Sequence, residues 1–313
     1  MSEEQHKESN PFKAAMSRSV PATGKFMGTK LHLNISDAEY RRMDGMNQSF
    51  IKAVHKQGPV HAEHYEHVER EQTKAMLIGS LFHCMVLEPE LVETRYARLP
   101  ANVDRRTTVG KAAYAEFENY AQGKDIITDM DWMVAEAMAF NSQSVLAESI
   151  KRDTQKGHEP QIHHEAAFTS TLLLEWSDDN GSSKVEIPIK GKLDSLVKFS
   201  DTHWRIYDLK SMACLGDDEV VGAARGGCWN IQSAFYADAM RSMQRIKDSV
   251  VDFHYIASEK DLPNKAREYS VSDMMFMRGR NNYLKAMLHH WLWNSAGRPS
   301  NYEAYAGVGE LNA

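Results

Sequence analysis

Two aspartates and one lysine stand in two neighbouring stretches that each alternate between apolar and polar residues. Asp194 lies in the first stretch, and Asp208 and Lys210 lie in the second. Side chains two apart on a strand share a face, so Asp208 and Lys210 are expected to project together. If the stretches pair as strands, Asp194 approaches Asp208, and two carboxylates without a neutralising partner favour a divalent cation. A lysine beside them can orient a water or stabilise charge on a phosphate, so the pattern indicates metal-assisted phosphodiester hydrolysis.

These two stretches are predicted to form a β-hairpin. Apolar residues recur at alternate positions from Ile187 to Phe199, which is the period of a strand. Residues 200–202 supply turn chemistry, and an extended pattern resumes at Trp204. The same spacing also fits an ion pair on the solvated face of an ordinary hairpin, so the surrounding elements must decide between the two interpretations.

The rest of the chain is predicted to surround this hairpin with helices. The expected elements are a helix from Ser36 to Val54, a partly helical segment over 60–90, helices over 111–121 and 130–149, strands over 162–210, a loop over 215–227, a helix over 229–244, a strand over 250–258 and a helix over 272–293. This order predicts one mixed α/β domain with a central β-sheet flanked by helices. We expect that domain to span 31–294, between a disordered tail at 1–30 and a flexible tail at 295–313.

Composition bounds the class of protein. The 313 residues are 42% hydrophobic and 26% charged, which is ordinary for a soluble globular protein, and no run of about eighteen apolar residues predicts a membrane span. The N-terminus lacks the apolar core of a signal peptide. Three scattered cysteines, Cys84, Cys214 and Cys228, argue against a disulfide framework and a four-cysteine metal site, so a reducing cytoplasm is expected. The net charge of −6 speaks against a dedicated DNA binder, although a local basic groove can coexist with an acidic surface.

Two further features have chemical potential. Gln232 and Tyr236 are four apart on a predicted helix and share a face, where an amide and a phenol could bind a phosphate or a nucleobase edge. The alternative is that Tyr236 is a core aromatic and Gln232 lies at the surface. His83 is polar on an otherwise apolar helical stretch, and a neutral imidazole can ligate a metal or form a hydrogen bond within the core.

Taken in order, the motifs G-x-x-x-H, G-x-x-D, D-x-K and Q-x-x-x-Y resemble the PD-(D/E)xK nuclease superfamily. Within its RecB-like branch they are similar to the nuclease domain of RecE, exonuclease VIII, and its phage relatives. The matching stretches are Ile78–His83 with the MVLEPE that follows, the loop DRRTTVGKAAYAEF, Gly191–Asp194, Tyr207–Lys210 and Gln232–Tyr236. The resemblance implies a restriction-endonuclease-like core. The acidic net charge departs from the expected pattern, and the missing cluster cysteines remove an iron–sulfur variant.

The resemblance also implies a magnesium site, at which Mn²⁺ can substitute. Its expected ligands are an imidazole, two carboxylates and a backbone carbonyl: His83, Asp194, Asp208 and Leu209. A further acidic residue upstream of the first aspartate assists the metal in many relatives, and Glu165 is the candidate here, with Glu175 as its rival.

Other residues acquire roles from the same resemblance. Lys210 is expected to orient or activate the attacking water, with Gln232 and Tyr236 positioning the lysine or the DNA. A basic loop could guide the strand through phosphate contacts, and its candidate residues are Arg105, Arg106 and Lys111. The alternative is a mobile, solvated loop.

The implied function is a 5′-to-3′ exonuclease on linear double-stranded DNA that acts in phage or prophage recombination in a bacterial cell. Its expected partners are duplex DNA ends, a single-strand annealing recombinase and further copies of the chain in a homo-oligomeric ring. One alternative is a catalytically inert DNA- or partner-binding module on the same fold. Another is a zinc protein, whose candidate ligands are His61, His64 and His67, or His163 and His164.

Overall fold

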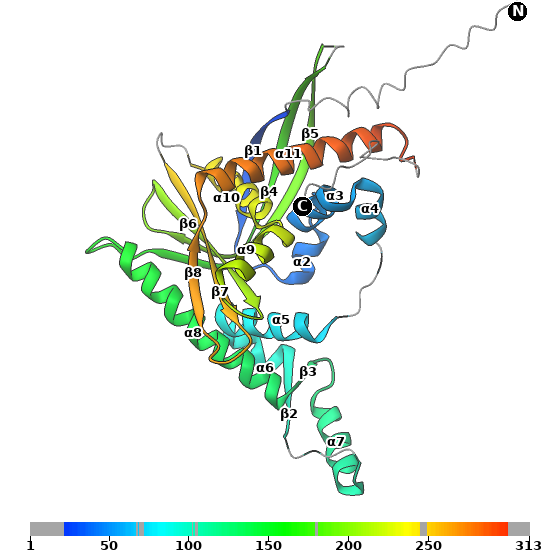
Figure 1. Cartoon of the computed structure of the whole chain (residues 1–313), viewed down its shortest axis with the longest axis vertical. Coiled ribbons are helices and arrows are strands. Elements are labelled where there is room, and N and C mark those ends of the chain that lie inside the picture. Colours follow the sequence, from blue (N-terminus) through cyan, green and yellow to red (C-terminus); the bar gives the residue numbers. More distant parts are fainter. Residues whose placement is uncertain are drawn as a thin grey trace, which may run out of the picture.

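The computed structural model describes residues 22–66, 68, 72–101, 103, 106–178, 181–244 and 249–299. A six-stranded sheet forms its centre, in the order β1-β4-β5-β6-β7-β8 (Figure 1). These strands are β1 (Ala22–His32), β4 (Gln161–Asp178), β5 (Gly181–Lys198), β6 (His203–Met212), β7 (Val250–Glu259) and β8 (Ala266–Ser270). Strands β6 and β7 run parallel, and the other neighbours run antiparallel.

Helices cover both faces of this sheet (Figure 1). One face packs against α3 (Gln48–Gln57), α10 (Trp229–Arg241) and α11 (Asp273–Ser295), around buried residues such as Phe168 and Phe235. The other packs against α5 (Lys74–Leu87) and α8 (Asp129–Asp153), around residues such as Phe82 and Tyr207. The predicted mixed α/β fold with a central sheet flanked by helices is therefore confirmed.

A helical connection between β6 and β7 carries one wall of the site. After β6 the chain forms α9 (Asp217–Gly226) and α10, then returns as β7 beside and parallel to β6. Parallel neighbours need a crossover of this kind, because a tight turn cannot reverse the direction of the chain twice. The crossover places α10 against the face of β6 from which Asp208 projects.

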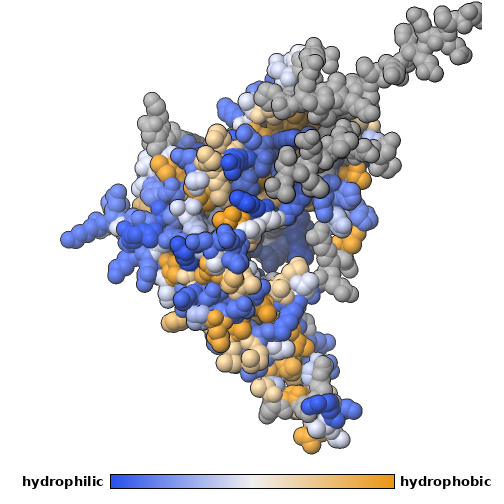
Figure 2. Space-filling view, in the orientation of Figure 1, coloured by the Kyte–Doolittle hydropathy of each residue, from blue (hydrophilic) through white to orange (hydrophobic). Residues whose placement is uncertain are grey.

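A smaller unit projects from the body at the lower end of Figure 1. It consists of the paired strands β2 (Tyr96–Leu99) and β3 (Asp125–Thr128) with α7 (Thr108–Tyr120). Ala97, Phe117 and Ala121 form its small core. Apolar side chains remain exposed on it and on the start of α8, including Val109, Tyr120 and Met130, and this end of the molecule shows hydrophobic surface in Figure 2.

Short elements connect the large ones. These are α2 (Asp37–Arg42), α4 (Pro59–Glu66), the 3₁₀ turn Pro89–Leu91 and α6 (Val92–Arg95). The expected single helix from Ser36 to Val54 is instead two helices, α2 and α3. The segment between them pairs with β5, because Met46 forms a parallel bridge with Ile189. Gly45 allows this close approach: it has a φ of 122°, and a Cβ on it would lie 2.6 Å from the backbone carbon of Ile189.

Two other expectations are wrong. Residues 22–30 belong to strand β1 and not to a tail, and the expected loop over 215–227 contains helix α9. Phe26 is the only buried residue of this edge strand, so its apolar pattern was too weak to predict. Residues 1–21 and 300–313 lie outside the described residues. Across the described part of the chain, every helix is too short or too polar to cross a bilayer.

Candidate active site

Strands β5 and β6 part where the two aspartates lie. Their ladder ends at the pair Ser195–Tyr207, while β6 continues to pair with β7 as far as Met212. Beyond that point the Asp194 carboxylate replaces the missing strand partner, since its Oδ2 accepts the Leu209 backbone N–H at 2.8 Å. The separation of β5 from β6 leaves the carboxylates of Asp194 and Asp208 beside an opening in the sheet. Side chains from α5 on one face and from α10 on the other reach this opening.

His83 reaches this opening from α5. Its Nδ1 lies 3.4 Å from Asp194 Oδ2. Gly79, one turn earlier, keeps the helix close to β6, because a Cβ there would lie 3.2 Å from Ser211 Oγ. Burial and the charge of Lys210 lower the pKa of His83, which favours the neutral imidazole that can ligate a metal.

Asp208 faces the opposite helix, α10. It is 1% exposed, its Oδ2 accepts a hydrogen bond from Gln232 Nε2, and its Oδ1 forms an ion pair with Lys210. The Lys210 ammonium also lies 5.5 Å from the ring of Tyr255 and 5.9 Å from that of Trp229. Two aromatic rings and one carboxylate therefore position the Lys210 ammonium where β5 and β6 separate.

Tyr236 lies one turn after Gln232 and is buried at 4% exposure. Its ring meets that of Phe168 edge-on, with centroids 5.7 Å apart. Gly191 makes this contact possible, because a Cβ there would lie 2.3 Å from Phe168 Cε1 and 2.8 Å from Tyr236 Cε1. Burial raises the pKa of Tyr236 well above its ordinary value. In the Q-x-x-x-Y pair, Gln232 contacts an acidic residue directly, whereas Tyr236 packs in the core beside the glycine of G-x-x-D.

Glu165 lies across the β4–β5 hairpin from Asp194. It falls between the pairs His164–Ser195 and Ala166–Leu193, and its φ of 52° is left-handed. Such a conformation is costly for a residue other than glycine and often marks a functional position. Burial and the charge of Asp194 raise the pKa of Glu165, while an ion pair with Lys192 opposes this.

Glu175, the rival candidate, lies at the other end of the same hairpin. It stands opposite Lys184 and next to Thr23 of β1. The register of the hairpin therefore brings Glu165, and not Glu175, to the parted strands.

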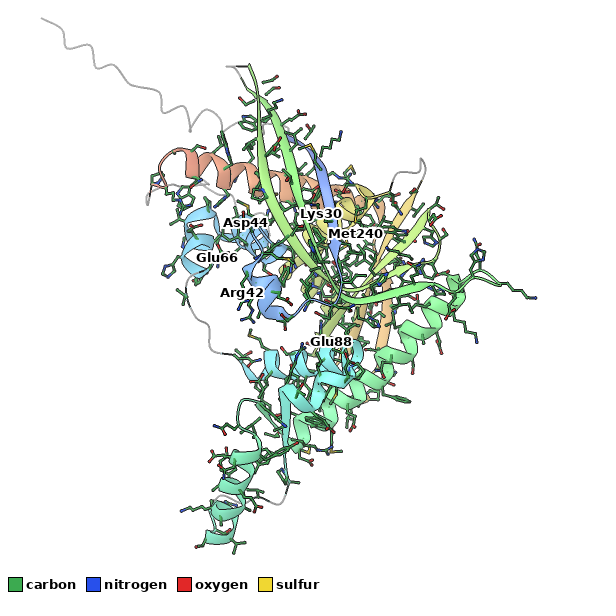
Figure 3. All side chains as sticks on the ribbon, turned by 180° about the vertical axis from the view of Figure 1, so that it is seen from behind. Lys30, Arg42, Asp44, Glu66, Glu88 and Met240 are labelled. Carbon is green, nitrogen blue, oxygen red and sulfur yellow. The ribbon has the colours of Figure 1, made fainter. Side chains whose placement is uncertain are left out.

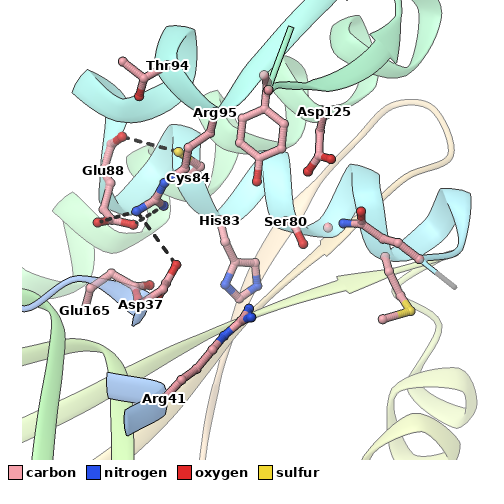
Figure 4. Close-up of a pocket in the computed structure, with 15 residues that line it drawn as sticks. Asp37, Arg41, Ser80, His83, Cys84, Glu88, Thr94, Arg95, Asp125 and Glu165 are labelled. Carbon is pink, nitrogen blue, oxygen red and sulfur yellow. Dashed lines mark hydrogen bonds and ion pairs between the residues drawn. The ribbon is translucent and has the colours of Figure 1, made fainter. Parts of the chain in front are cut away.

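A cavity of about 710 Å³ opens beside this cluster, between α2 and α5. His83 and Glu165 line it, together with Asp37, Arg41 and Arg95. The imidazole of His83 points into the cavity, and Arg41 extends toward it from α2 (Figure 4). Figure 2 shows the surface hollowed in this region. The view from behind places Arg42 on α2 and Glu88 at the end of α5 below it (Figure 3).

The expected basic residues lie apart from this cluster. Lys111 is in the first turns of α7, on the projecting unit, and Arg106 lies just before that helix. Arg105 falls outside the described residues. His61 and His64 are on α4 and His67 is undescribed, while the neighbours His163 and His164 are on β4.

Lys52 was missed in the sequence. It comes from α3, and its Nζ donates a hydrogen bond to Gln232 Oε1 at 2.9 Å. Burial and the charge of Lys210 lower the pKa of Lys52 to about 7. On an amphipathic helix a lone lysine is ordinarily solvated, so the sequence contained no signal that it turns inward.

The donors around the parted strands suit a hard divalent cation. Asp208 Oδ1 is buried and, among the residues that the structure describes, makes no hydrogen bond beyond its ion pair with Lys210. Burial together with the charge of Asp208 raises the pKa of Asp194. Two carboxylates that destabilise each other in this way are stabilised by a shared cation. Within the described ranges, no three His, Cys, Asp or Glu side chains are placed as a metal-binding group, and Asp208 contacts Lys210 and Gln232 instead.

Without metal, the protein should lose stability as the pH rises from about 4 to about 7. Burial and the Asp208 charge raise the pKa of Asp194 from 3.8 to about 7. Between these pH values the folded protein keeps a proton on Asp194 that the unfolded chain has released. The stabilisation that this proton gives is therefore complete below the pKa of the unfolded state and is lost as the pH rises through the pKa of the folded state. The free energy of unfolding can be measured by urea titration in EDTA at about pH 5 and about pH 8. Between these two pH values it should fall by at least about 1 kcal/mol more in the wild type than in Asp194→Asn. Equal losses would contradict this assignment.

One family model and several solved structures show similarity to this chain. The family model of the PD-(D/E)XK nuclease superfamily matches residues 60–294. A candidate exonuclease from Eubacterium rectale aligns over 86% of this chain and 89% of its own, with 15% identity and a TM-score of 0.49. Rai1 from Scheffersomyces stipitis, crystallised with (3′-NADP)⁺ and calcium, aligns over 84% of this chain and 69% of its own, with 12% identity and a TM-score of 0.27. No match was found among curated proteins. Because the family model matches most of the chain, including all the motifs that build the parted strands, the chain belongs to the PD-(D/E)XK nuclease superfamily.

Proposed function

We propose that the chain is a Mg²⁺-dependent deoxyribonuclease that digests linear double-stranded DNA from its 5′ ends. The observation that carries this proposal is the meeting of His83 with Asp194 at the parted strands, beside the Asp208–Lys210 pair. Membership of a nuclease superfamily supports phosphodiester hydrolysis. The exonuclease class and its polarity rest on the resemblance of the motifs to the RecE nuclease domain.

His83, Asp194 and Asp208 would hold the magnesium ion together with the Leu209 carbonyl, and Mn²⁺ could substitute. When bound, the ion supplies Lewis-acid activation of the scissile phosphate and lowers the pKa of a water. Lys210 orients the nucleophile and stabilises charge that develops on the phosphate. Gln232 holds the Asp208 carboxylate, and Tyr236 packs behind the strand that carries Asp194.

Glu165 is a further acidic residue beside the proposed metal site. Glu165 assists as a further carboxylate beside Asp194, and its ion pair with Lys192 holds it at the cavity wall. Lys192 in turn lies 2.6 Å from Asp37 of α2, so α2 is tied to the same wall. Lys111 of α7 and Arg106 just before that helix would guide DNA through phosphate contacts, and Arg105 is a further candidate for this role.

The biological role follows from the same resemblance. Digestion from 5′ ends would expose single strands for an annealing recombinase in phage or prophage recombination, in the cytoplasm of a bacterial host. A homo-oligomeric ring would keep the enzyme on its strand.

Digestion of linear and covalently closed circular duplexes tests the proposal directly. With Mg²⁺ we expect loss of the linear form alone, and EDTA should stop it. A label at the 5′ end should be released before a label at the 3′ end. Release from the 3′ end first would overturn the polarity, and cleavage of the closed circle would overturn the exonuclease class.

A catalytically inert module on the same fold predicts a different result. Such a protein would leave both DNAs intact and would show no Mg²⁺ binding that depends on Asp194. Calorimetric titration of Mg²⁺ into the wild type and Asp194→Asn separates the two cases.

A further inference from the structure

A chain of hydrogen bonds leads from α3 to Asp208. Lys52 Nζ donates to Gln232 Oε1 at 2.9 Å, and Gln232 Nε2 donates to Asp208 Oδ2. Gln232 is 5% exposed and Asp208 is 1% exposed, so water cannot readily replace either contact. The three residues come from three elements, α3, α10 and β6, that meet in the core behind the parted strands.

The chemistry of Lys52 determines how the Gln232 amide is turned. A glutamine side chain has a donor end and an acceptor end, and rotation by half a turn exchanges them. If the acceptor end faced Asp208, two oxygens would oppose each other in a buried site. A lysine ammonium is a donor only, so it binds the acceptor end and directs the donor end to the carboxylate.

Gln232 then holds the Asp208 carboxylate by one of its two oxygens. It binds Oδ2, whereas Lys210 occupies Oδ1, the oxygen that the metal would use. Groups that orient a metal-binding side chain in this way commonly change metal affinity or activity about 10–100-fold when they are removed.

We propose that Lys52 is a positioning residue that sets the orientation of the Gln232 amide and thereby holds the Asp208 carboxylate ready to bind metal. The metal-binding part of this inference rests on the proposed function. The protonated form of Lys52 sets this orientation most strictly, because it has no lone pair with which to accept from the amide N–H. Burial and the charge of Lys210 lower the pKa of Lys52 to about 7, and the neutral amine present above that pH can still donate to Gln232 Oε1 but can also accept.

Lys52→Met is the informative substitution, because it retains the length of the side chain and removes every donor. We expect Mg²⁺ affinity, measured by calorimetry, and kcat to fall about 10–100-fold. The thermal stability of the metal-free protein should change little, since relief of a costly buried ammonium opposes the loss of the hydrogen bond to the buried Gln232 oxygen. Lys52→Arg keeps a donor and should recover part of the affinity. Lys56→Met is the matched control, because Lys56 is an exposed lysine one turn further along α3. This variant should behave as the wild type.

A double-mutant cycle separates positioning from an independent role. If Lys52 acts through Gln232, Lys52→Met should change Mg²⁺ affinity less than about twofold in a Gln232→Met background, because contacting residues are not additive. Equal effects of Lys52→Met in both backgrounds, or wild-type affinity of the single variant, would overturn the proposal.

A third measurement keeps this inference distinct from the proposed function. In metal-free ¹⁵N-labelled protein, the Gln232 side-chain amide should exchange slowly with water, and Lys52→Met should abolish that protection while Lys56→Met preserves it. An unchanged amide signal in Lys52→Met would reject the positioning role. A wild-type protein that shows the protected amide but binds no Mg²⁺ and digests no DNA would reject the proposed function instead.

Discussion

Asp208→Asn should reduce Mg²⁺-dependent digestion of linear duplex DNA by at least about a thousandfold. Asparagine preserves the shape of the side chain and removes its charge. Stabilisation by a bound metal is worth several kcal/mol, and each factor of ten in rate corresponds to about 1.4 kcal/mol. Because Asp208 is 1% exposed, the substituted side chain stays in the site and the charge is lost there without a shift of the side chain into solvent. The measurement is the initial rate of nucleotide release at saturating Mg²⁺, with calorimetry to follow the loss of metal binding.

Asp201→Asn is the control for this substitution. Asp201 lies in the exposed turn of the same hairpin, so it undergoes the same chemical change away from the parted strands. It should digest DNA at the wild-type rate. Full Mg²⁺-dependent activity of Asp208→Asn, with its fold intact by circular dichroism, would remove Asp208 from the site.

The hairpin could be predicted because its signals are local. Alternating apolar residues and a turn fix the pairing of β5 with β6, and a strand places Asp208 and Lys210 on one face whatever the rest of the chain does. The structure shows that pair in contact. Glu165 was also within reach of the sequence. Residue types typical of a turn occur over 177–181 of the sequence, and the observed register of β4 against β5 sets Glu165 opposite Asp194, a stronger criterion than its position upstream.

Other parts depended on contacts that no local pattern records. Strand β1 alternates weakly because it lies at the edge of the sheet, and α9 contains glycines that are typical of a loop. The parting of β5 from β6 arises because β6 continues along β7, a partner about forty residues away in sequence. Lys52 shows the same limit for a side chain, since only the packing of α3 against α10 turns it toward Gln232.

Lys210→Met should slow digestion about 10²–10³-fold while leaving Mg²⁺ binding at least as tight as in the wild type. The rate and the metal affinity change differently because Lys210 is expected to have two separate effects at the site. Its ammonium stabilises charge on the reacting phosphate, and it also occupies Asp208 Oδ1, an oxygen that the metal would use. Removing the ammonium therefore removes a competitor for the carboxylate as well as a catalytic group.

The thermal stability of Lys210→Met should also reveal the competition between Lys210 and the metal for Asp208. Without Lys210 a buried carboxylate loses its partner, so the metal-free variant should unfold at a lower temperature than the wild type, and Mg²⁺ should raise its Tm by more. Lys198→Met is the matched control, because Lys198 also lies over an aromatic ring, 4.5 Å from that of Trp204, but at the far end of the β5–β6 ladder. Single-turnover rates and calorimetric titrations on the two variants provide the comparison. A Lys210→Met protein that binds Mg²⁺ poorly would mean that the lysine supports metal binding, and unimpaired digestion would mean that it has no part in the reaction.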